Sequence, residues 1–336
     1  MRILHISDLH FGIKEGKERS RKEVAGRDYY IDDLIRGLGS ITAKQPLDYI
    51  FITGDIAYSA SEEAYQEAGM WLTKISRVCR VPADRIYLCP GNRDIDKQKM
   101  KDAVCPENQQ EAKELLNIEN FDQLSKKFRM YRKFCHDAGL PTYELGGKQN
   151  YLTGVAVNSC VNVVCLNTAW FAEADTGKNN VWIGSDLVKQ IKREKKYANG
   201  QPTIAIMHHP VASWNEEERS SVNNSDNVYH EVCRIADMIL TGHTHAAEDG
   251  YGYWNDVYIC GNGAVYKGQM YHHNFHMYEW DSGKAGPIDC IRTVYEFNGS
   301  TWHRKSEKIR IEAKNRQENK SEKPFRYSFS ILWWTR

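Results

Sequence analysis

Short apolar runs, each followed at once by a cluster of polar residues, are the feature that most limits how this chain can fold. The runs are rich in β-branched residues and alternate with longer amphipathic segments, which favours an α/β sheet with crossover helices. The predicted strands are 3–7, 49–53, 86–89, 161–166, 203–207 and 238–240, and the predicted helices are 29–44, 61–79, 118–137 and 185–197. Ser61, followed by Glu62 and Glu63, is the expected N-cap of the second helix.

The pattern changes after Thr244. Strands are predicted at 257–260, 275–280, 288–297 and 308–311, separated by Gly, Asn and Asp, and this part is expected to be antiparallel. From 304 to 323 charged residues replace large apolar ones, which is typical of a solvated segment. We therefore divide the chain into a domain at 1–303 and a charged arm with an aromatic C-terminal segment at 304–336, which is either a linker or a packed extension.

Composition excludes several classes of protein. The 336 residues carry a formal net charge of +1, which argues against a polyanion binder that relies on bulk charge. The polar first ten residues lack the apolar region of a secretory signal, and no window reaches the roughly 18 apolar residues of a membrane span. Nine cysteines without a Cys-x-x-Cys pair indicate reduced thiols, so a cytoplasmic protein with no membrane association is expected.

Side chains able to bind metal follow five of the predicted strands. In open α/β sheets, sites are built at the carboxyl ends of the strands. One such cluster alone would indicate little, but five in succession predict a single shared site. The clusters are Asp8-Leu9-His10, Gly54-Asp55, Gly91-Asn92-Arg93-Asp94, His208-His209-Pro210 and Gly242-His243-Thr244-His245.

The mixture of imidazoles, carboxylates and one amide suits Mn, Fe or Zn better than an all-oxygen calcium site or a thiolate zinc site. Alternate residues of an extended segment point the same way, so Asp8 and His10 are expected to reach one ion together. His243 and His245 are expected to reach two neighbouring ions. Asp55 is the natural bridging carboxylate, because a glycine precedes it and lets the backbone approach closely.

In order and spacing, these motifs resemble the Asp-x-His, Gly-Asp, Gly-Asn-His-Asp/Glu, His and Gly-His-x-His motifs of the calcineurin-like metallophosphoesterase superfamily. The resemblance covers about residues 1–300. It implies a four-layer α/β/β/α sandwich of two mixed β-sheets flanked by helices, with a dinuclear metal site at the sheet rim. It also implies one ion held by Asp8, His10, Asp55 and His245, and another held by Asp55, Asn92, His208 and His243.

The chain departs from the family pattern at Arg93, where the family has a histidine that acts on the leaving group or the phosphoryl group. Arginine is not a proton donor near neutral pH, but its planar fork can hold two phosphate oxygens. Catalysis without that donor favours good leaving groups, unless His209, His272, His273 or His276 substitutes. The alternative is a degenerate site that binds metal or ligand and turns over poorly.

The expected catalytic set is Asn92, Arg93, Asp94 and His209. We interpret Asp94 as a hydrogen-bond partner of ligands rather than a ligand, and we leave His209 open between a catalytic role and simple packing. His5 and His136 are read as structural. For the basic stretches 14–27 and 97–101, solvated loop charges are favoured over an anion-gathering rim. Core packing is favoured over base stacking for the aromatics Tyr29, Tyr30, Trp170, Phe171, Trp182 and Trp214.

The leading hypothesis is a binuclear metal-dependent phosphoesterase, in which a hydroxide bridging two divalent ions attacks phosphorus. Mn is the expected metal, with Fe, Zn or Co as alternatives. A phosphodiester is favoured, either a nucleotide or a nucleic acid as in a nuclease. A phosphomonoesterase is the alternative within this class. Inserted segments 95–117, 139–156 and 212–226 are expected to shape the pocket.

Two hypotheses come from other classes. One is a catalytically weakened metal-binding or ligand-binding effector module of a larger sensor protein, with a further domain or protein partner attached through the C-terminal segment. The other is a dinuclear enzyme of oxygen chemistry, which the Gly-His-x-His context disfavours.

Overall fold

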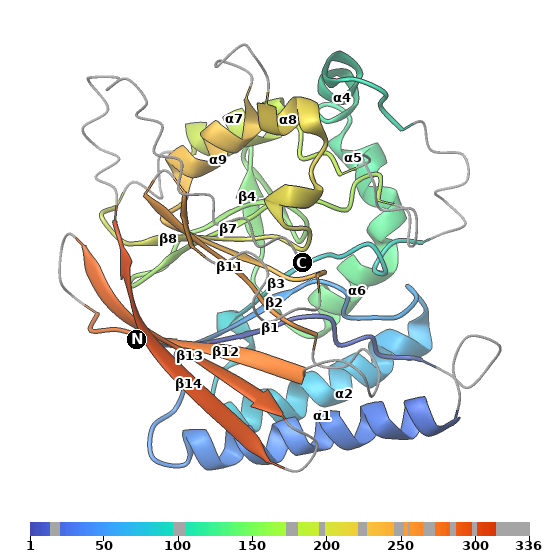
Figure 1. Cartoon of the computed structure of the whole chain (residues 1–336). Coiled ribbons are helices and arrows are strands. Elements are labelled where there is room, and N and C mark those ends of the chain that lie inside the picture. The colour runs from blue at the N-terminus through green and yellow to red at the C-terminus, as the bar shows by residue number, and fades with distance from the viewer. Residues whose placement is uncertain are drawn as a thin grey trace, which may run out of the picture.

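Two β-sheets packed face to face form the centre of the molecule (Figure 1). The computed structural model describes residues 1–13, 21–96, 105–172, 181–194, 199–220, 227–244, 252–254, 256–264, 273–282, 287–297 and 301–313. The first sheet has the order β14 (Trp302–Ile311), β13 (Ile288–Phe297), β12 (His273–Glu279), β1 (Arg2–Ile6), β2 (Tyr49–Thr53), β3 (Ile86–Cys89). The second has the order β10 (Gly252–Trp254), β11 (Val257–Gly261), β9 (Met238–Thr241), β8 (Thr203–Ile206), β7 (Asn162–Cys165), β6 (Gly154–Ala156), β4 (Tyr143–Leu145), β5 (Lys148–Asn150).

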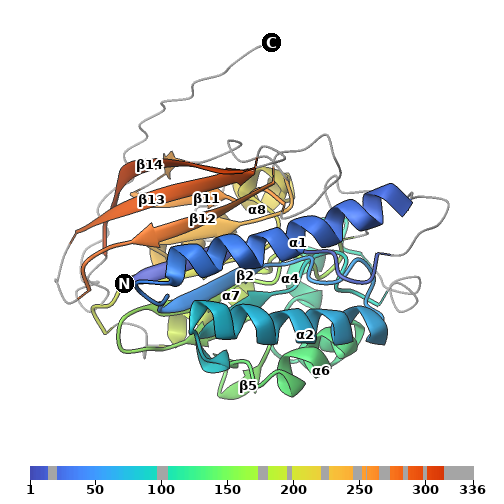
Figure 2. The ribbon, with the colours of Figure 1, turned by 90° about the horizontal axis from the view of Figure 1, so that it is seen from below.

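Helices cover the outer faces of both sheets. Figure 2 shows α1 (Arg21–Thr42) and α2 (Glu62–Cys79) lying side by side along the first sheet. In Figure 1, α7 (Ser185–Arg193), α8 (Glu216–Ser220) and α9 (Val228–Ile235) lie on the other side, over the second sheet. The remaining elements are α4 (Gln109–Leu115), α5 (Phe121–Leu124), α6 (Arg129–Asp137) and the 3₁₀ turns Ala83–Arg85, Ser125–Phe128 and Val211–Ser213. The expected four-layer α/β/β/α sandwich of two mixed sheets is confirmed.

Alternating side chains of the central strands explain the two apolar layers. In β1, Ile3 joins a cluster between the sheets that also contains Phe51, Ile204 and Leu240. Its neighbour Leu4 belongs to the cluster shared with the covering helices. Every residue of β1, β2 and β3 is buried, as expected for parallel strands covered on both faces.

The predicted strands before Thr244 are confirmed to within a residue or two, and the N-cap is confirmed because Ser61 Oγ accepts from the amide of Ala64 at 3.3 Å. The predicted helix 118–137 is broken into α5, a 3₁₀ turn and α6. The antiparallel prediction beyond Thr244 holds for β10, β12, β13 and β14 but is wrong for the contact of β11 with β9, which is parallel. Segment 139–156 is not simply a pocket insertion, because it supplies β4, β5 and β6 of the second sheet.

The predicted arm begins inside a strand. β14 pairs with β13 along its whole length, from Ile288 opposite Ile311 to Phe297 opposite Trp302. Residues 304–311 therefore belong to the first sheet, so the predicted strand 308–311 is confirmed as the end of β14 and the predicted boundary at 303 is wrong. The charges from 304 onward resemble those of a solvated segment because an edge strand carries charged side chains on its exposed positions. Residues 314–336 lie outside the described part of the chain.

The described residues contain no helix long and apolar enough to cross a membrane. No disulfide joins the nine cysteines, of which seven are buried.

We expect β14 to contribute to the stability of the core. Ile309 is 7% exposed and packs between the sheets, so Ile309→Ala should lower the free energy of unfolding by about 2 kcal/mol or more. The neighbouring Lys308 is exposed, so Lys308→Ala should change it by less than about 0.5 kcal/mol. Denaturant unfolding of both variants checks this, and equal effects would show that β14 does not belong to the cooperative core.

Candidate metal centre

The five sequence clusters follow β1, β2, β3, β8 and β9, as predicted. Ligand atoms of Asp8, Asp55 and His208 lie within 4.8 Å of one another. The same limit encloses ligand atoms of His208, His209 and His243. His208 is common to both groups, so side chains that follow both sheets meet at one rim. His245 lies outside the described residues, and its assignment stays a prediction.

The backbone at this rim is left-handed where the ligands stand. Asp8, His10, Asp55 and His243 have φ angles of 56°, 50°, 51° and 71°. Non-glycine residues rarely adopt positive φ, and such residues cluster at functional sites. The expectation that Asp8 and His10 converge because they alternate along an extended segment is therefore wrong. β1 ends at Ile6, and the two side chains converge through successive left-handed turns.

Hydrogen bonds between two loops hold these turns in place. The amide of Asp8 donates to the Gly54 carbonyl at 3.1 Å, that of His10 to the Asp55 carbonyl at 3.0 Å, and that of Phe11 to the Ile56 carbonyl at 2.8 Å. The ladder between β1 and β2 thus continues past the ends of both strands. These hydrogen bonds hold the Asp8-Leu9-His10 and Gly54-Asp55 motifs side by side and impose the unfavourable positive φ angles.

Two glycines allow the close approach that the site requires. A Cβ on Gly54, whose φ is 87°, would lie 2.5 Å from His208 Nδ1. A Cβ on Gly91 would lie 2.2 Å from Asp55 Oδ1. Both distances are far below van der Waals contact, so any larger residue would push a ligand out of place.

The first group of ligands surrounds two buried carboxylates. His10 Nε2 lies 3.8 Å from Asp8 Oδ1, and His10 Nδ1 lies 4.0 Å from Asp55 Oδ2. Asp8 Oδ2 accepts from Ser7 Oγ at 2.5 Å and from the amide of His243 at 3.1 Å. Asp8 is completely buried and Asp55 is 3% exposed, so both negative charges are removed from water.

The second group forms around His208. Its Nδ1 lies 2.8 Å from the carbonyl oxygen of Thr53, and a carbonyl can only accept, so Nδ1 carries a hydrogen. Nε2 then faces Asn92 Oδ1 at 3.1 Å and Asp55 Oδ1 at 3.5 Å. In the neutral ring, three lone-pair atoms converge there. A proton or a metal ion would relieve their repulsion.

The pKa shifts of Asp55 and His208 also indicate a position that favours a cation. Burial raises the pKa of Asp55, as do the negative charges of Asp8 and Asp94, although His208 opposes the shift. Burial would lower the pKa of His208, but Asp55 and Asp8 outweigh burial and raise it. Both pKa shifts reflect negative charge gathered at this position, which a cation would neutralise. Buried carboxylate, imidazole and amide groups make a donor set suited to divalent transition metals.

Arg93 is anchored through its backbone. Its amide donates to Asp55 Oδ1 at 2.9 Å, and its guanidinium lies over the ring of Tyr58, with Cζ 4.7 Å from the ring centre. Both side chains are partly exposed. Arg93 thus contacts, through its backbone, a carboxylate that belongs to both ligand sets implied by the family resemblance, while its side chain stays partly exposed.

Asp94 joins the loop that follows β2 to the loop that follows β3 through hydrogen bonds. Its carboxylate accepts from the amides of Ile56, Ala57 and Gly91 at 3.3, 3.1 and 2.9 Å, and from the hydroxyl of Tyr65 at 2.9 Å. Burial and the neighbouring Asp94 raise the pKa of Tyr65, so the phenol keeps its proton and donates. This position agrees with the interpretation of Asp94 as an orienting partner rather than a ligand.

His209 belongs to the imidazole cluster. Its ring centre lies 4.4 Å from that of His243 and 4.8 Å from that of His208. Thr168 Oγ1 accepts from its amide at 3.0 Å and lies 2.8 Å from its Nδ1. Burial, His208 and His243 lower the pKa of His209 far below its usual range, so its ring is neutral.

The other residues considered from the sequence lie elsewhere. His273 and His276 are buried within β12, beside Tyr30 and Cys260 respectively, and His272 lies outside the described residues. His5 is fully buried with Nε2 2.9 Å from Thr53 Oγ1, and His136 is exposed. Burial first, and then Arg292, lowers the pKa of His5 to about 3.

Four of the six aromatic side chains considered from the sequence are core residues, but core packing is wrong for Tyr29, which is 50% exposed, and Tyr30 is only partly buried. Phe171 is 2% exposed, and the three tryptophans are at most 1% exposed, so they offer no surface for stacking a base. The tryptophans are Trp170, Trp182 and Trp214. Arg27 is also buried, and it pairs with Glu67 at 2.6 Å. Residues 14–20 and 97–104, which hold most of the two basic stretches, lie outside the described residues.

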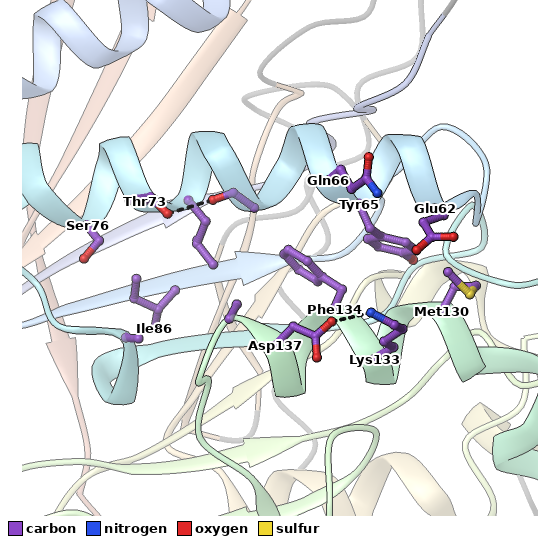
Figure 3. A pocket seen from close by; sticks show the side chains of 14 residues that line it. Glu62, Tyr65, Gln66, Thr73, Ser76, Ile86, Met130, Lys133, Phe134 and Asp137 are labelled. Carbon is purple, nitrogen blue, oxygen red and sulfur yellow. Dashed lines mark hydrogen bonds and ion pairs between the residues drawn. The ribbon is translucent and has the colours of Figure 1, made fainter.

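Sequence reasoning missed four residues that support the site: Ser7, Tyr58, Tyr65 and Thr168. Ser7 adjoins a motif, but the other three come from positions with no pattern of their own. Figure 3 shows that Tyr65 also lines a groove of about 420 Å³ between α2 and α6, where its ring stacks on Phe134 with centres 5.2 Å apart. None of the residues that line the groove is a candidate metal ligand, and Tyr65 connects it to the site because its hydroxyl donates to Asp94.

The fold and the site together define a class of protein. It is a two-sheet α/β protein with a site of histidine, carboxylate and amide side chains at the rim. The family model described as calcineurin-like phosphoesterase matches residues 1–247. The chain belongs to that family, whose members bind divalent metals. β12, β13 and β14, which lie beyond the matched residues, complete the first sheet.

Among solved structures, the chain is similar to a Vps29 mutant of Entamoeba histolytica, with 11% identity, 93% of this chain and 99% of that chain covered, and a TM-score of 0.37. It is similar to the sulfate thiohydrolase SoxB of Thermus thermophilus, with 12% identity, coverages of 91% and 56%, and a TM-score of 0.44. It is also similar to a protein-tyrosine phosphatase of a Shewanella species, with 12% identity, coverages of 91% and 80%, and a TM-score of 0.36. No curated protein matches the sequence significantly.

Removal of the Asp55 charge should raise the stability of the metal-free protein and lower that of the metal-loaded protein. Because the pKa of Asp55 is raised in the fold, its ionised form is disfavoured there, and the stability of metal-free protein should fall as pH rises through that pKa. Asp55→Asn should reduce this dependence and make metal-free protein more stable at pH 8. Binding at a hundred times Kd should stabilise the wild type by about 2.7 kcal/mol, and most of this gain should be lost in the variant.

Thermal unfolding at pH 6 and 8, with chelator or with Mn²⁺, tests both statements. Asp137→Asn is the matched control, because Asp137 is an exposed carboxylate on α6 paired with Lys133. A metal-free Asp55→Asn protein less stable than the wild type at pH 8 would contradict the electrostatic account.

Proposed function

We propose that the chain is a binuclear metal-dependent phosphoesterase. The observation that supports this most directly is the convergence of His208 Nε2, Asn92 Oδ1 and Asp55 Oδ1 within 3.5 Å, beside a second group that contains Asp8 and His10. Asp55 would be common to both ions. One ion would take Asp8, His10, Asp55 and His245, and the other Asp55, Asn92, His208 and His243.

Mn is the metal we propose, with Fe, Zn or Co as alternatives, because a site of histidines and carboxylates accepts all of them. We also propose a cytoplasmic location, which the absence of disulfides among the nine cysteines supports.

When bound, the two ions supply Lewis-acid activation of water and neutralise charge that develops on the phosphoryl group. The chain's own residues provide the geometry. Asp94 holds the loops that carry Asp55 and Asn92, Asn92 presents its amide to metal or phosphate, and Arg93 offers a planar fork to phosphate oxygens. His209, which is neutral and held by Thr168, faces the same cluster as a further polar contact for substrate.

The Arg93 side chain narrows the substrate class. Arginine cannot release a proton near neutral pH, so this position gives no acid to the leaving group. We favour phosphodiesters because the planar fork of Arg93 would suit a nucleotide or nucleic-acid phosphate. Among such esters, those with the better leaving groups should react faster, and a sugar alkoxide would need a proton from another donor. A phosphomonoesterase is the alternative.

The first experiment is hydrolysis of bis-p-nitrophenyl phosphate and of p-nitrophenyl phosphate by Mn-loaded protein. We expect faster cleavage of the diester. Asp55→Ala should remove activity to below about one part in 10³, because loss of the shared carboxylate disrupts both ion sites. Asp137→Ala, which removes an exposed carboxylate on α6, should leave the rate unchanged.

Monoester cleavage alone would replace the phosphodiesterase proposal with a phosphatase. Protein that carries its metals but cleaves neither ester would support the effector hypothesis instead. Metal content measured on each sample separates these outcomes from simple loss of the ions.

A series of aryl phosphodiesters with leaving groups of increasing pKa tests the part that Arg93 plays. In the wild type the rate should fall steeply along the series, because this position gives no proton to the departing oxygen. Arg93→His should flatten the dependence and raise the rate on the poorest leaving group by about 10- to 100-fold, since general acid catalysis is worth about 10²–10⁴ at best. Arg93→Lys keeps the charge without the fork and should keep the steep dependence. Equal slopes for wild type and Arg93→His would contradict the assignment.

A further inference from the structure

Arg93 is a long, partly exposed side chain, and holding its guanidinium in one place costs rotamer entropy. An arginine that is not held would sample many positions, and its fork would meet phosphate in only some of them. One contact that opposes this freedom is with Tyr58, whose ring centre lies 4.7 Å from Arg93 Cζ. A guanidinium within about 6 Å of an aromatic ring is attracted by the negative face of the ring.

Tyr58 is itself fixed relative to the ligands. Its amide donates to the carbonyl of Phe11 at 2.8 Å, and the amide of Phe11 donates to the carbonyl of Ile56 at 2.8 Å. Tyr58 therefore belongs to the same ladder of loop hydrogen bonds that fixes Asp8 and His10. Its ring meets the His10 ring edge to face, with centres 6.1 Å apart and planes at 73°.

The two partners are thus tied to the site through separate backbone contacts. Arg93 is anchored at its amide by Asp55 Oδ1 at 2.9 Å, while Tyr58 is anchored through Phe11 and lies against His10. The guanidinium is supported where the Asp55 and His10 loops meet. Arg93 Cζ lies over the Tyr58 ring, and the guanidinium carries five N–H donors with which it can bind phosphate oxygens.

We propose that Tyr58 is a positioning residue that orients Arg93 for phosphate binding, an inference that rests on the proposed function. The ring, not the hydroxyl, provides this support. Its contribution acts through Arg93 and disappears when the guanidinium is absent.

A double-mutant cycle on metal-loaded full-length protein tests this, with inorganic phosphate as the probe and calorimetry as the measurement. Tyr58→Leu should weaken phosphate binding about three- to tenfold, the range that a partly exposed cation–π contact provides. Tyr58→Phe should stay within about twofold of the wild type. In an Arg93→Met background, Tyr58→Leu should cause no further loss.

Equal weakening by Tyr58→Leu in both backgrounds would overturn the proposal, because Tyr58 would then act on phosphate without Arg93. Loss in Tyr58→Phe as large as in Tyr58→Leu would also overturn it, since the hydroxyl would then be the active group. If the metal-loaded wild type binds no phosphate, that result would contradict the proposed function on which this inference rests.

The Arg93 Nε–H signal in NMR spectra gives a second measurement that needs neither phosphate nor turnover. The signal can be identified by its absence in Arg93→Met. A proton near the face of an aromatic ring is shifted by the ring current, so the shift should persist in Tyr58→Phe and vanish in Tyr58→Leu. An unchanged shift in Tyr58→Leu would show that the ring does not hold the guanidinium, whatever the protein does to phosphate.

Discussion

Two carboxylates buried side by side, Asp8 and Asp55, set the conditions that the rest of the site has to meet. Removing one negative charge from water is costly, and removing two within a few ångströms of each other is more so. The surrounding groups turn donors toward them: the hydroxyl of Ser7 and the amides of His243 and Arg93. These donors reduce the cost without cancelling the charge, because the pKa of Asp55 stays raised. A site built around an uncancelled pair of charges is one that a divalent cation stabilises.

Besides burying two carboxylates, the site requires a left-handed backbone. Four residues adopt it: Asp8, His10, Asp55 and His243. A backbone in this region is less stable than an extended one for any residue except glycine, and it persists only when its surroundings impose it. Here the surroundings are buried strands and the loop ladder that continues the pairing of β1 with β2. The two-sheet core therefore does more than carry the site, because its burial energy keeps the ligands in a strained geometry that the loops alone would not adopt.

This division explains which features the sequence could predict. Strand ends were visible in the alternation of apolar runs with polar clusters, and parallel strands bring such ends together, so Asp8, Asp55 and His208 could be assigned to one site. The turn geometry could not be predicted, since Asp and His tolerate positive φ without requiring it. Of β14, only the end at 308–311 could be predicted as a strand, because the buried Ile309 and Ile311 lie there and residues 302–307 have no buried apolar side chain. Tyr58, Tyr65 and Thr168 act through tertiary contacts that leave no periodic signal.

Arg93, which stands where the family pattern has a histidine, contributes to the site in two independent ways. Its amide donates to Asp55 Oδ1, and any residue except proline can do the same. Its side chain is partly exposed and lies over the ring of Tyr58. A substitution here can therefore change the charge and shape of one side chain while the buried carboxylates, their donors and the strained turns stay as they are. At this residue, the group offered to a substrate is separable from the scaffold that positions the candidate metal ligands.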